Sequence, residues 1–263
     1  MTRSETDLLA EERRQRIVEL LALHGKVRAQ ELMQRFGVSN DTIRRDLTDM
    51  EQQRLLRRVH GGALPAGAPV PARPSWNERL GVDETEKAAL VDAFLPELRG
   101  GELLFLDSGT TNGLLARRLP RDLPFTVITP SPEVALALCD HPRCEVIVPG
   151  GRLHAPTASF CGPQALRLIE GVQADLCVLG VCAVSAAGGI SVHEFEEVAV
   201  KQAMLGHATR TVAMATAAKV GTRLAYRVAD AQRLSLLLTT ADEASEGARD
   251  IERLGVPVMR VAV

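Results

Sequence analysis

Apolar positions between residues 25 and 63 follow two short helical patterns separated by a glycine. The first pattern recurs at i, i+3, i+4 and i+7, which predicts one buried stripe made of Ala29, Leu32, Met33 and Phe36. Gly37 then ends this helix, and Ser39 can cap the next one by accepting an amide hydrogen bond. The inward stripe of the second helix consists of Ile43, Leu47 and Met50. The segment is therefore predicted to be two packed helices joined by a tight turn.

The opposite face of the second helix carries polar side chains that could enter a DNA groove. At about 100° per residue, Asp41, Thr42, Arg45 and Asp49 point away from Ile43. A second helix that reads base edges near its N-terminus is the geometry of helix-turn-helix proteins. The alternative is a solvated charge ladder worth only a few tenths of a kcal/mol per pair. The candidate DNA contacts on this helix are Ser39, Asn40, Thr42, Arg44 and Arg45.

The continuation from Arg54 to Ala63 favours DNA binding, because it contains three arginines and no acid. Leu56 to Val59 is predicted to be a short strand, and Gly61 and Gly62 permit the tight turn of a β wing. Such a wing would set cationic groups against phosphates, which position a protein on DNA without reading sequence. The candidate wing contacts are Arg57, Arg58 and His60.

These residues resemble a known family. TIRRDL at Thr42 to Leu47, followed by LLRRVHGGA at Leu55 to Ala63, resembles the winged helix-turn-helix signature of DeoR-type transcriptional regulators. The resemblance spans residues 11 to 65. Arg54 departs from it, since the family usually has a glycine there, and this should alter the turn or add a phosphate contact.

Charge and proline content divide the chain. The net charge is -2, yet residues 1 to 65 hold 12 Lys and Arg against 10 Asp and Glu, while the other 198 residues hold 19 against 23. This mildly basic module predicts modest DNA affinity alone, so two or more modules should act together. Residues 65 to 74 carry four prolines among small residues, which is typical of a semi-rigid linker. We expect a DNA-binding domain at 1–64, a linker at 65–76 and a second domain at 77–263.

Beyond the linker, apolar runs alternate with segments of helical character. The predicted strands are Leu103 to Asp107, Phe125 to Thr129, Cys144 to Pro149, Ala174 to Val181, Arg210 to Thr216, Leu234 to Thr240 and Val256 to Val263. The predicted helices are Thr85 to Leu98, Thr111 to Leu119, Pro132 to Cys139, Pro163 to Glu170, Glu196 to His207 and Asp242 to Leu254. This alternation predicts an α/β domain with a mostly parallel sheet covered on both faces. Ligands of such folds bind at the carboxyl ends of the strands.

Several polar motifs follow those strand ends. Ser108 to Thr111 can offer amides and hydroxyls to an anion at a helix N-terminus, or can form an ordinary capped turn. Gly151 permits close approach of a ligand, and Arg152 can pair with phosphate or simply lie on the surface. Glu197 and Lys201 share one helical face, as a surface ion pair or as a pocket pair, and Lys219 is a further candidate cation.

In order and spacing these motifs resemble the DeoR-type C-terminal sensor, from about Asn77 to Thr240. That sensor has the fold of ribose-5-phosphate isomerase and CoA-transferase-like proteins and generally responds to phosphorylated sugars. The resemblance implies an effector site in which five residues surround the phosphate: Asp107, Ser108, Gly109, Thr110 and Thr111. The rest of the pocket would be lined by Gly151, Glu197, Lys201 and Lys219, and Arg152 is a further candidate effector contact beside Gly151.

Three departures bear on the effector. Pro130 stands where the family commonly has Asn, Cys182 stands where it has Asp, and Thr216 with two alanines replaces an Asp-Ser-Ser run. A buried hydroxyl that loses its partner costs about 1 to 3 kcal/mol. We therefore expect a phosphorylated metabolite with fewer hydroxyls than a common sugar phosphate, or a pocket that no longer senses sugar phosphates.

The sequence thus predicts a transcriptional regulator, a repressor, that binds a double-stranded DNA operator and a phosphorylated effector as a homo-oligomer, dimer or tetramer. The alternative is a phosphosugar isomerase or transferase carrying a DNA-binding module; the missing acids at Cys182 and Thr216 disfavour it. No cofactor or metal is expected, because the five cysteines form no C-x-x-C pair. With no long apolar run or signal peptide, we expect a cytoplasmic protein that does not enter the membrane.

Overall fold

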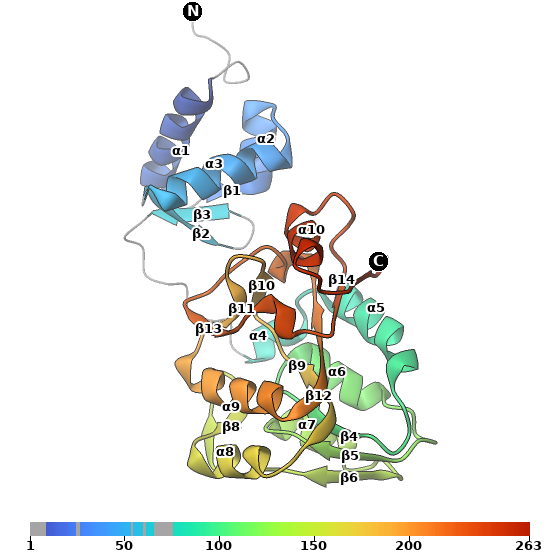
Figure 1. Cartoon of the computed structure of the whole chain (residues 1–263). Coiled ribbons are helices and arrows are strands. Elements are labelled where there is room, and N and C mark those ends of the chain that lie inside the picture. The colour runs from blue at the N-terminus through green and yellow to red at the C-terminus, as the bar shows by residue number, and fades with distance from the viewer. Residues whose placement is uncertain (1–8, 25–26, 54, 60–61, 66–75) are drawn as a thin grey trace, which may run out of the picture. The chain divides into compact units, whose positions relative to one another are not determined.

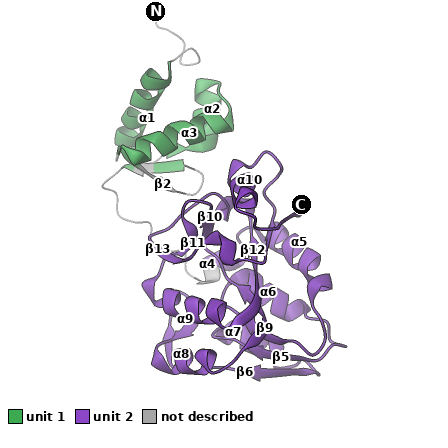
Figure 2. Ribbon diagram, viewed as in Figure 1, with its two compact units in different colours: residues 1–72 green, residues 73–263 purple. Residues whose placement is uncertain are grey.

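The computed structural model of the chain describes residues 9–24, 27–53, 55–59, 62–65 and 76–263 (Figure 1). The chain divides into two compact units, residues 1–72 and 73–263 (Figure 2). The linker prediction falls almost entirely on residues outside the described ranges, as do Arg54, His60 and Gly61. Each unit has its own hydrophobic core.

The N-terminal unit is a helix-turn-helix followed by a β wing. Its helices are α1 (Ala10–His24), α2 (Ala29–Phe36) and α3 (Asn40–Gln52), and its strands are β1 (Val27–Arg28), β2 (Leu56–Val59) and β3 (Gly62–Pro65). Strand β3 pairs antiparallel with both of the other strands. Helix α1 and strand β1 complete the unit. The apolar pattern of the sequence did not predict where either element begins or ends.

Local sequence sets the turn between α2 and α3. Gly37 ends α2 in the left-handed conformation at a φ of 64°, which a glycine adopts without strain. The Ser39 hydroxyl caps α3 by accepting from the Thr42 backbone N–H at 3.2 Å, as predicted. Five residues of the expected stripes, Leu32, Phe36, Ile43, Leu47 and Met50, are at most 2% exposed, and Ala29 and Met33 are partly buried against them.

A buried ionic contact fastens α1 to α3. The Asp46 carboxylate accepts from Arg13 Nε at 2.6 Å and from Arg14 Nε at 3.0 Å, and the Arg13 and Asp46 side chains are only 9% and 4% exposed. Arg14 also pairs with Asp49, so that Asp49 packs toward α1 instead of belonging to an exposed charge ladder. Because both partners of such a pair are desolvated, losing one leaves an uncompensated charge.

The C-terminal unit is built on a seven-stranded sheet in which every neighbouring pair is parallel. Its strand order is β15 (Val258–Arg260), β14 (Leu236–Thr239), β12 (Ala208–Ala215), β9 (Ala174–Leu179), β4 (Leu103–Leu106), β5 (Phe125–Ile128) and β6 (Cys144–Ile147). All seven strands lie within the apolar runs of the sequence, apart from the first two residues of β12. The predicted mixed α/β fold with a mostly parallel sheet is confirmed.

Helices cover both faces of this sheet (Figure 1). One core contains α5 (Glu84–Phe94), α6 (Thr110–Arg118) and α7 (Pro132–Leu138). The other contains α8 (Pro163–Glu170), α9 (Phe195–Gly206) and α10 (Glu246–Arg253). Successive strand residues serve opposite faces, since Leu104 and Leu106 pack in the first core and Phe105 in the second. Burial on both faces explains why the strands are continuously apolar.

Strand order reverses between β4 and β9. From β4 the chain winds outward through β5 to β6, then returns to place β9 on the other side of β4 and continues to β15. Two smaller sheets, which the sequence did not indicate, lie along the connections. They are the hairpin β7 (Arg152–His154) with β8 (Ser159–Cys161), and an antiparallel sheet of β10 (Ala183–Ser185), β11 (Gly189–Val192) and β13 (Tyr226–Ala229). The carboxyl ends of β4 and β9 thus form the switch point at which ligands bind in such folds.

Among the residues described, no helix has the length and apolar character needed to cross a membrane.

The Asp46 contact yields a stability prediction for the N-terminal unit. Changing Asp46 to Ala should lower its free energy of unfolding by about 3 kcal/mol, because Arg13 is left buried without a counter-charge. Hydrogen exchange of peptides from α3, followed by mass spectrometry, measures this in the full chain. Asp41, exposed on the same helix, is the control, and its Ala variant should cost under about 1 kcal/mol. Equal loss of protection in both variants would contradict the assignment.

Candidate functional site

A cavity of about 150 Å³ lies where β4 and β9 end, within the C-terminal unit. Seven of the ten predicted effector residues line it: Ser108, Gly109, Thr110, Thr111, Glu197, Lys201 and Lys219. Residues that the motifs did not indicate complete the wall, notably Arg79, Asp83, Lys87, Asn112, Gly180 and His193. The cavity is therefore assembled from α4 (Trp76–Leu80), the ends of two strands, and the helices α5, α6 and α9.

The loop after β4 presents the N-terminus of α6 to this cavity. Gly109, the N-cap residue at a φ of 140°, has no side chain with which to cap the first amides of the helix. The Asn112 side chain instead donates to the backbone oxygens of Asp107 at 3.1 Å and Val178 at 3.0 Å, which ties the helix start to both strand ends. Uncapped amides and the positive end of the helix dipole favour an anion at Thr110 and Thr111.

Asp107 lies beneath the loop and holds the two strand ends together. Its carboxylate accepts from the backbone N–H of Ser108 at 2.7 Å and of Gly180 at 2.8 Å, and it forms an ion pair with Lys201. Lys201 also donates to the Gly180 oxygen at 2.7 Å. Burial lowers the pKa of Lys201, but the charges of Asp107 and Glu197 outweigh this, so its pKa is raised overall and the ammonium stays charged.

Gly180 permits this close approach. A Cβ built at Gly180 would lie 2.1 Å from the backbone oxygen of Ser108 and 3.1 Å from the Asp107 carboxylate. Any larger residue would push the end of β9 away from the loop after β4. The glycine after β9 is thus required by packing at the floor of the site.

Cations gather on the α4 and α5 side of the cavity. Lys87 Nζ donates to the Arg79 backbone oxygen at 2.8 Å, and Lys219 Nζ donates to the Val181 oxygen at 3.0 Å. Burial lowers the pKa of Lys87, and the nearby charges of Lys219 and Arg79 lower it further, against the opposite effect of Asp83. Mutual repulsion among these cations would be relieved by an anionic ligand.

Asp83 adds an acid to the same wall. It adopts the left-handed conformation at a φ of 52°, which is uncommon for a residue with a side chain, and it precedes α5. Its carboxylate accepts from the Thr216 hydroxyl at 3.3 Å. Thr216, one of the departures from the DeoR pattern, therefore contacts a wall residue of the cavity, and Cys182 lines the cavity directly.

Three predicted features lie elsewhere. Gly151 has a packing explanation, since its φ is 104° and a Cβ there would lie 2.7 Å from the Cys161 oxygen. Arg152 is 68% exposed and reaches Glu196 at 3.9 Å, away from the residues that line the cavity. Pro130 accepts from the Phe160 N–H at 2.7 Å and also lies outside that lining, so its departure from Asn does not bear on the cavity wall.

In the N-terminal unit, the outer face of α3 keeps its polar residues accessible. Ser39, Asn40 and Arg45 are exposed, and Thr42 and Arg44 are half-buried. No ion pair of Arg45 occurs within the described part of the chain. The face is therefore available to a ligand as the helical pattern predicted.

The wing packs against this helix through Arg58. Its guanidinium donates to the Thr48 hydroxyl at 2.7 Å, and its backbone N–H donates to Glu51 at 2.9 Å. Burial lowers the pKa of Arg58, and the nearby charge of Arg44 adds to that effect against Glu51. Arg44 and Arg58 thus bring two positive charges together where α3 meets β2. Arg57 lies in β2, and His60 falls outside the described residues.

A winged helix-turn-helix joined to an α/β unit with a cationic cavity defines a DNA-binding regulator with a sensor domain. Two family models match the chain, the DeoR-like helix-turn-helix domain over residues 13–66 and the DeoR C terminal sensor domain over residues 82–241. The chain belongs to the DeoR family of transcriptional regulators.

Curated relatives match over most of their length. The HTH-type transcriptional regulator GlpR of Haloferax volcanii is 31% identical over 252 residues, which is 96% of this chain and 98% of the relative. The glycerol-3-phosphate regulon repressor of Escherichia coli K12 is 29% identical, covering 78% of this chain and 81% of the relative.

Among solved structures, ribose 5-phosphate isomerase A of Methanocaldococcus jannaschii aligns at 13% identity with a TM-score of 0.40, over 54% of this chain and 55% of that one.

Sequence reasoning missed Arg79 and Lys87 because nothing local distinguishes them. Both occur in a polar, charged stretch before the first sensor strand that is indistinguishable from a solvated helix surface. One signal was present in the composition: the chain has only four lysines, and the three beyond residue 26 all line the cavity. Surface cations of the described sensor are arginines, so lysine itself marks the site.

Replacement of Gly180 by Ala should distort the floor of the site. The new Cβ meets a backbone carbonyl, which cannot rotate away, so the free energy of unfolding of the sensor should fall by at least about 2 kcal/mol. Urea unfolding followed by circular dichroism measures this. Gly206, where an added Cβ meets nothing within 4 Å, provides the control, and its Ala variant should be neutral or stabilising. Equal behaviour of the two variants would disprove the close approach.

Proposed function

We propose that this protein is a repressor whose DNA affinity changes when a phosphorylated metabolite binds in the cavity at the ends of β4 and β9. The observation that carries this proposal is the convergence of all three sensor lysines, Lys87, Lys201 and Lys219, on the uncapped N-terminus of α6. An ammonium is a compact point charge that suits phosphate, and a helix N-terminus adds aligned amides. Ser108, Gly109, Thr110 and Thr111 would hold the phosphate, and Lys219, which lines the same cavity, would pair with it.

The ligand we expect is small. The cavity of about 150 Å³ is below the ~300–1,000 Å³ of pockets for drug-sized ligands. A thiol at Cys182 offers a sugar hydroxyl a weaker partner than the family's carboxylate. One relative is named for the glycerol-3-phosphate regulon. A three-carbon phosphate ester, with fewer hydroxyls than a pentose phosphate, is therefore the first compound to titrate.

We propose binding without turnover. General acid-base catalysis requires a carboxylate that can exchange a proton with the substrate. Asp107 instead accepts from two backbone amides and from Lys201 beneath the loop, which fits a structural anion. The curated relatives are transcriptional regulators. A turnover assay with phosphosugars tests this, and measurable isomerase or transferase activity would overturn it.

DNA recognition is assigned to α3 and the wing. Arg45 and Thr42, with Ser39 and Asn40 at the helix start, would reach base edges in the major groove. Arg44, Arg57, Arg58 and His60 would contact phosphates, which fixes the position of the module without reading bases. As a dimer or tetramer, the protein would place several such modules on repeated half-sites, and we expect it to act on chromosomal DNA in the cytoplasm.

The two arginine assignments separate in a binding experiment. Changing Arg45 to Ala should cost about 1 to 3 kcal/mol on the preferred operator and relax base preference at one position. Changing Arg58 to Ala should weaken all sequences alike and lower the salt slope by about one. Fluorescence anisotropy measures the base preference and the salt slope. It uses a panel of operator variants taken from the DNA upstream of the protein's own gene. Unchanged base preference in the Arg45 variant would show that α3 is not the reading helix.

The lysine signals provide a direct assay of the effector site. Selective isotope labelling of lysine gives four sets of side-chain signals, of which Lys87, Lys201 and Lys219 should shift on titration with glycerol 3-phosphate. Lys26, in the other unit, is the internal control. Changing Lys219 to Gln should weaken the ester about ten- to a hundredfold, since a hydrogen bond to a charged group is worth about 1.5–3 kcal/mol. Ester binding that leaves all three sensor lysines unshifted would place the ligand elsewhere.

A further inference from the structure

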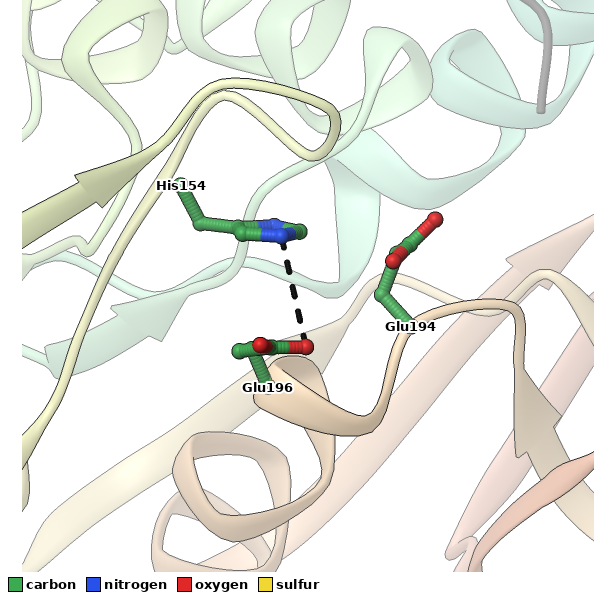
Figure 3. Close-up of side chains that lie close together, drawn as sticks. All are labelled: His154, Glu194 and Glu196. Carbon is green, nitrogen blue, oxygen red and sulfur yellow. Dashed lines mark ion pairs between the residues drawn. The ribbon is translucent and has the colours of Figure 1, made fainter. Parts of the chain in front are cut away.

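Three side chains with metal-ligating atoms meet beside the β7–β8 hairpin, apart from the cavity assigned to the effector. They are His154 at the end of β7, Glu194 just before α9, and Glu196 in the first turn of α9 (Figure 3). One ligand atom from each lies within 4.8 Å of the others, and all three residues are half-buried. The Nε2 atom of His154 is 4.0 Å from a carboxylate oxygen of Glu196.

The hydrogen bonds of Thr157 orient the imidazole for this purpose. The Thr157 hydroxyl donates its single hydrogen to the His154 backbone oxygen at 3.2 Å. The same hydroxyl oxygen lies 3.1 Å from Nδ1 of His154; with its hydrogen on the His154 oxygen, it accepts a hydrogen bond from a protonated Nδ1. In that tautomer the lone pair of the neutral ring is on Nε2, the nitrogen that faces Glu196. A histidine fixed in this way by its other nitrogen is the usual arrangement of a metal ligand.

A small cavity adjoins the cluster. His154, Thr157 and Glu196 line a space of about 10 Å³, close to the room that one water-sized particle needs. Ser108, Glu197 and Lys201 line both this space and the larger effector cavity. An occupant here would therefore lie next to the effector, on the α9 side.

The types of ligand atom determine which metal ions would suit the site. One imidazole nitrogen with two carboxylates suits Zn²⁺, Mn²⁺, Co²⁺ or Ni²⁺ better than Mg²⁺, which prefers oxygen ligands alone. Metal–ligand bonds of about 2.0–2.2 Å would draw the ligand atoms to about 3.4 Å from one another. Both glutamate side chains extend from the start of a helix, where side-chain rotation can supply this approach without moving the backbone.

Two other interactions of Glu196 are weaker than metal coordination would be. Glu196, in the first turn of α9, is stabilised by the positive end of the helix dipole by about 0.3–1 kcal/mol, an effect that does not involve a histidine. Arg152 lies 3.9 Å from Glu196, and with side chains 68% and 39% exposed this pair is largely screened. A protonated His154 would itself pair with Glu196 at 4.0 Å, and the metal titration below distinguishes that ion pair from a metal site.

We propose that His154, Glu194 and Glu196 bind one divalent transition-metal ion through His154 Nε2 and the two carboxylates, leaving a coordination position open to water or to a ligand in the adjoining cavity. The site joins β7 to the N-terminus of α9, the helix that also carries Glu197 and Lys201. It requires neither DNA nor the phosphate ester and can be tested without them.

Titration of the untagged full-length protein with Co²⁺ tests the proposal, because the visible spectrum reports both stoichiometry and ligand type. We expect one Co²⁺ per chain with a spectrum of nitrogen and oxygen ligands. His154→Ala, Glu194→Gln and Glu196→Gln should each weaken binding at least tenfold. Thr157→Val, which retains the ligands but releases the imidazole, should weaken it about 10- to 100-fold. Zn²⁺ should compete with Co²⁺, whereas Mg²⁺ should not.

The matched control is His207→Gln, a half-buried histidine at the other end of α9, which should leave Co²⁺ affinity unchanged. Circular dichroism of every variant verifies folding, and the Glu194 variant carries the test if His154→Ala does not fold. Three results would overturn the site: no saturable binding by the wild type, binding that survives in all folded ligand variants, or a thiolate charge-transfer band, which would place the metal on a cysteine such as the exposed Cys139.

Discussion

The sensor depends on one buried ion pair, between Asp107 at the end of β4 and Lys201 in the middle of α9. Strand order reverses between β4 and β9, so these strands diverge into loops beyond the backbone hydrogen bond from Asp107 N–H to the Val178 oxygen at 3.1 Å. Asp107 spans this gap, because it also accepts from the Gly180 amide after β9, and Lys201 donates back to the Gly180 oxygen. Removing either charge would leave the other buried and uncompensated. The same contact that stabilises the fold therefore fixes the floor of the cavity.

The contacts around this pair explain how the cavity acquires its charge. Asp107 uses its carboxylate within the floor, so the amides at the start of α6 and the ammonium groups of Lys87 and Lys219 are what the cavity presents to an anion. Lys201 belongs to both the floor and the wall of the cavity. Asp107 neutralises its charge in the floor, and its side chain also lines the cavity. On the far side of Lys201, α9 begins with the acids that meet His154. One helix thus connects the effector cavity to the proposed metal site.

The sequence predicted elements whose signal is local and missed those set by tertiary packing. Continuous apolar runs located the strands, because burial on both faces demands them, and the helix caps at Gly37 and Ser39 follow from single residues. The small-residue loop at Ser108–Thr111 was recognisable since a strand runs directly into it. Arg79 and Lys87 were not, because their position depends on how α4 and α5 fold back over the strand ends. Likewise His154 and Glu194 are 40 positions apart, and only the hairpin between them brings the imidazole to α9.

We propose that one equilibrium joins the two modules: a phosphate ester in the cavity would change the affinity of α3 and the wing for DNA, and DNA would then change the affinity for the ester by the same factor. The most direct test measures the operator Kd by fluorescence anisotropy while glycerol 3-phosphate and other small phosphate esters are titrated. We expect an ester that shifts the sensor lysines to raise the operator Kd by about 5- to 150-fold, the usual range of such coupling. An ester that saturates the cavity and leaves the operator Kd unchanged would contradict this coupling.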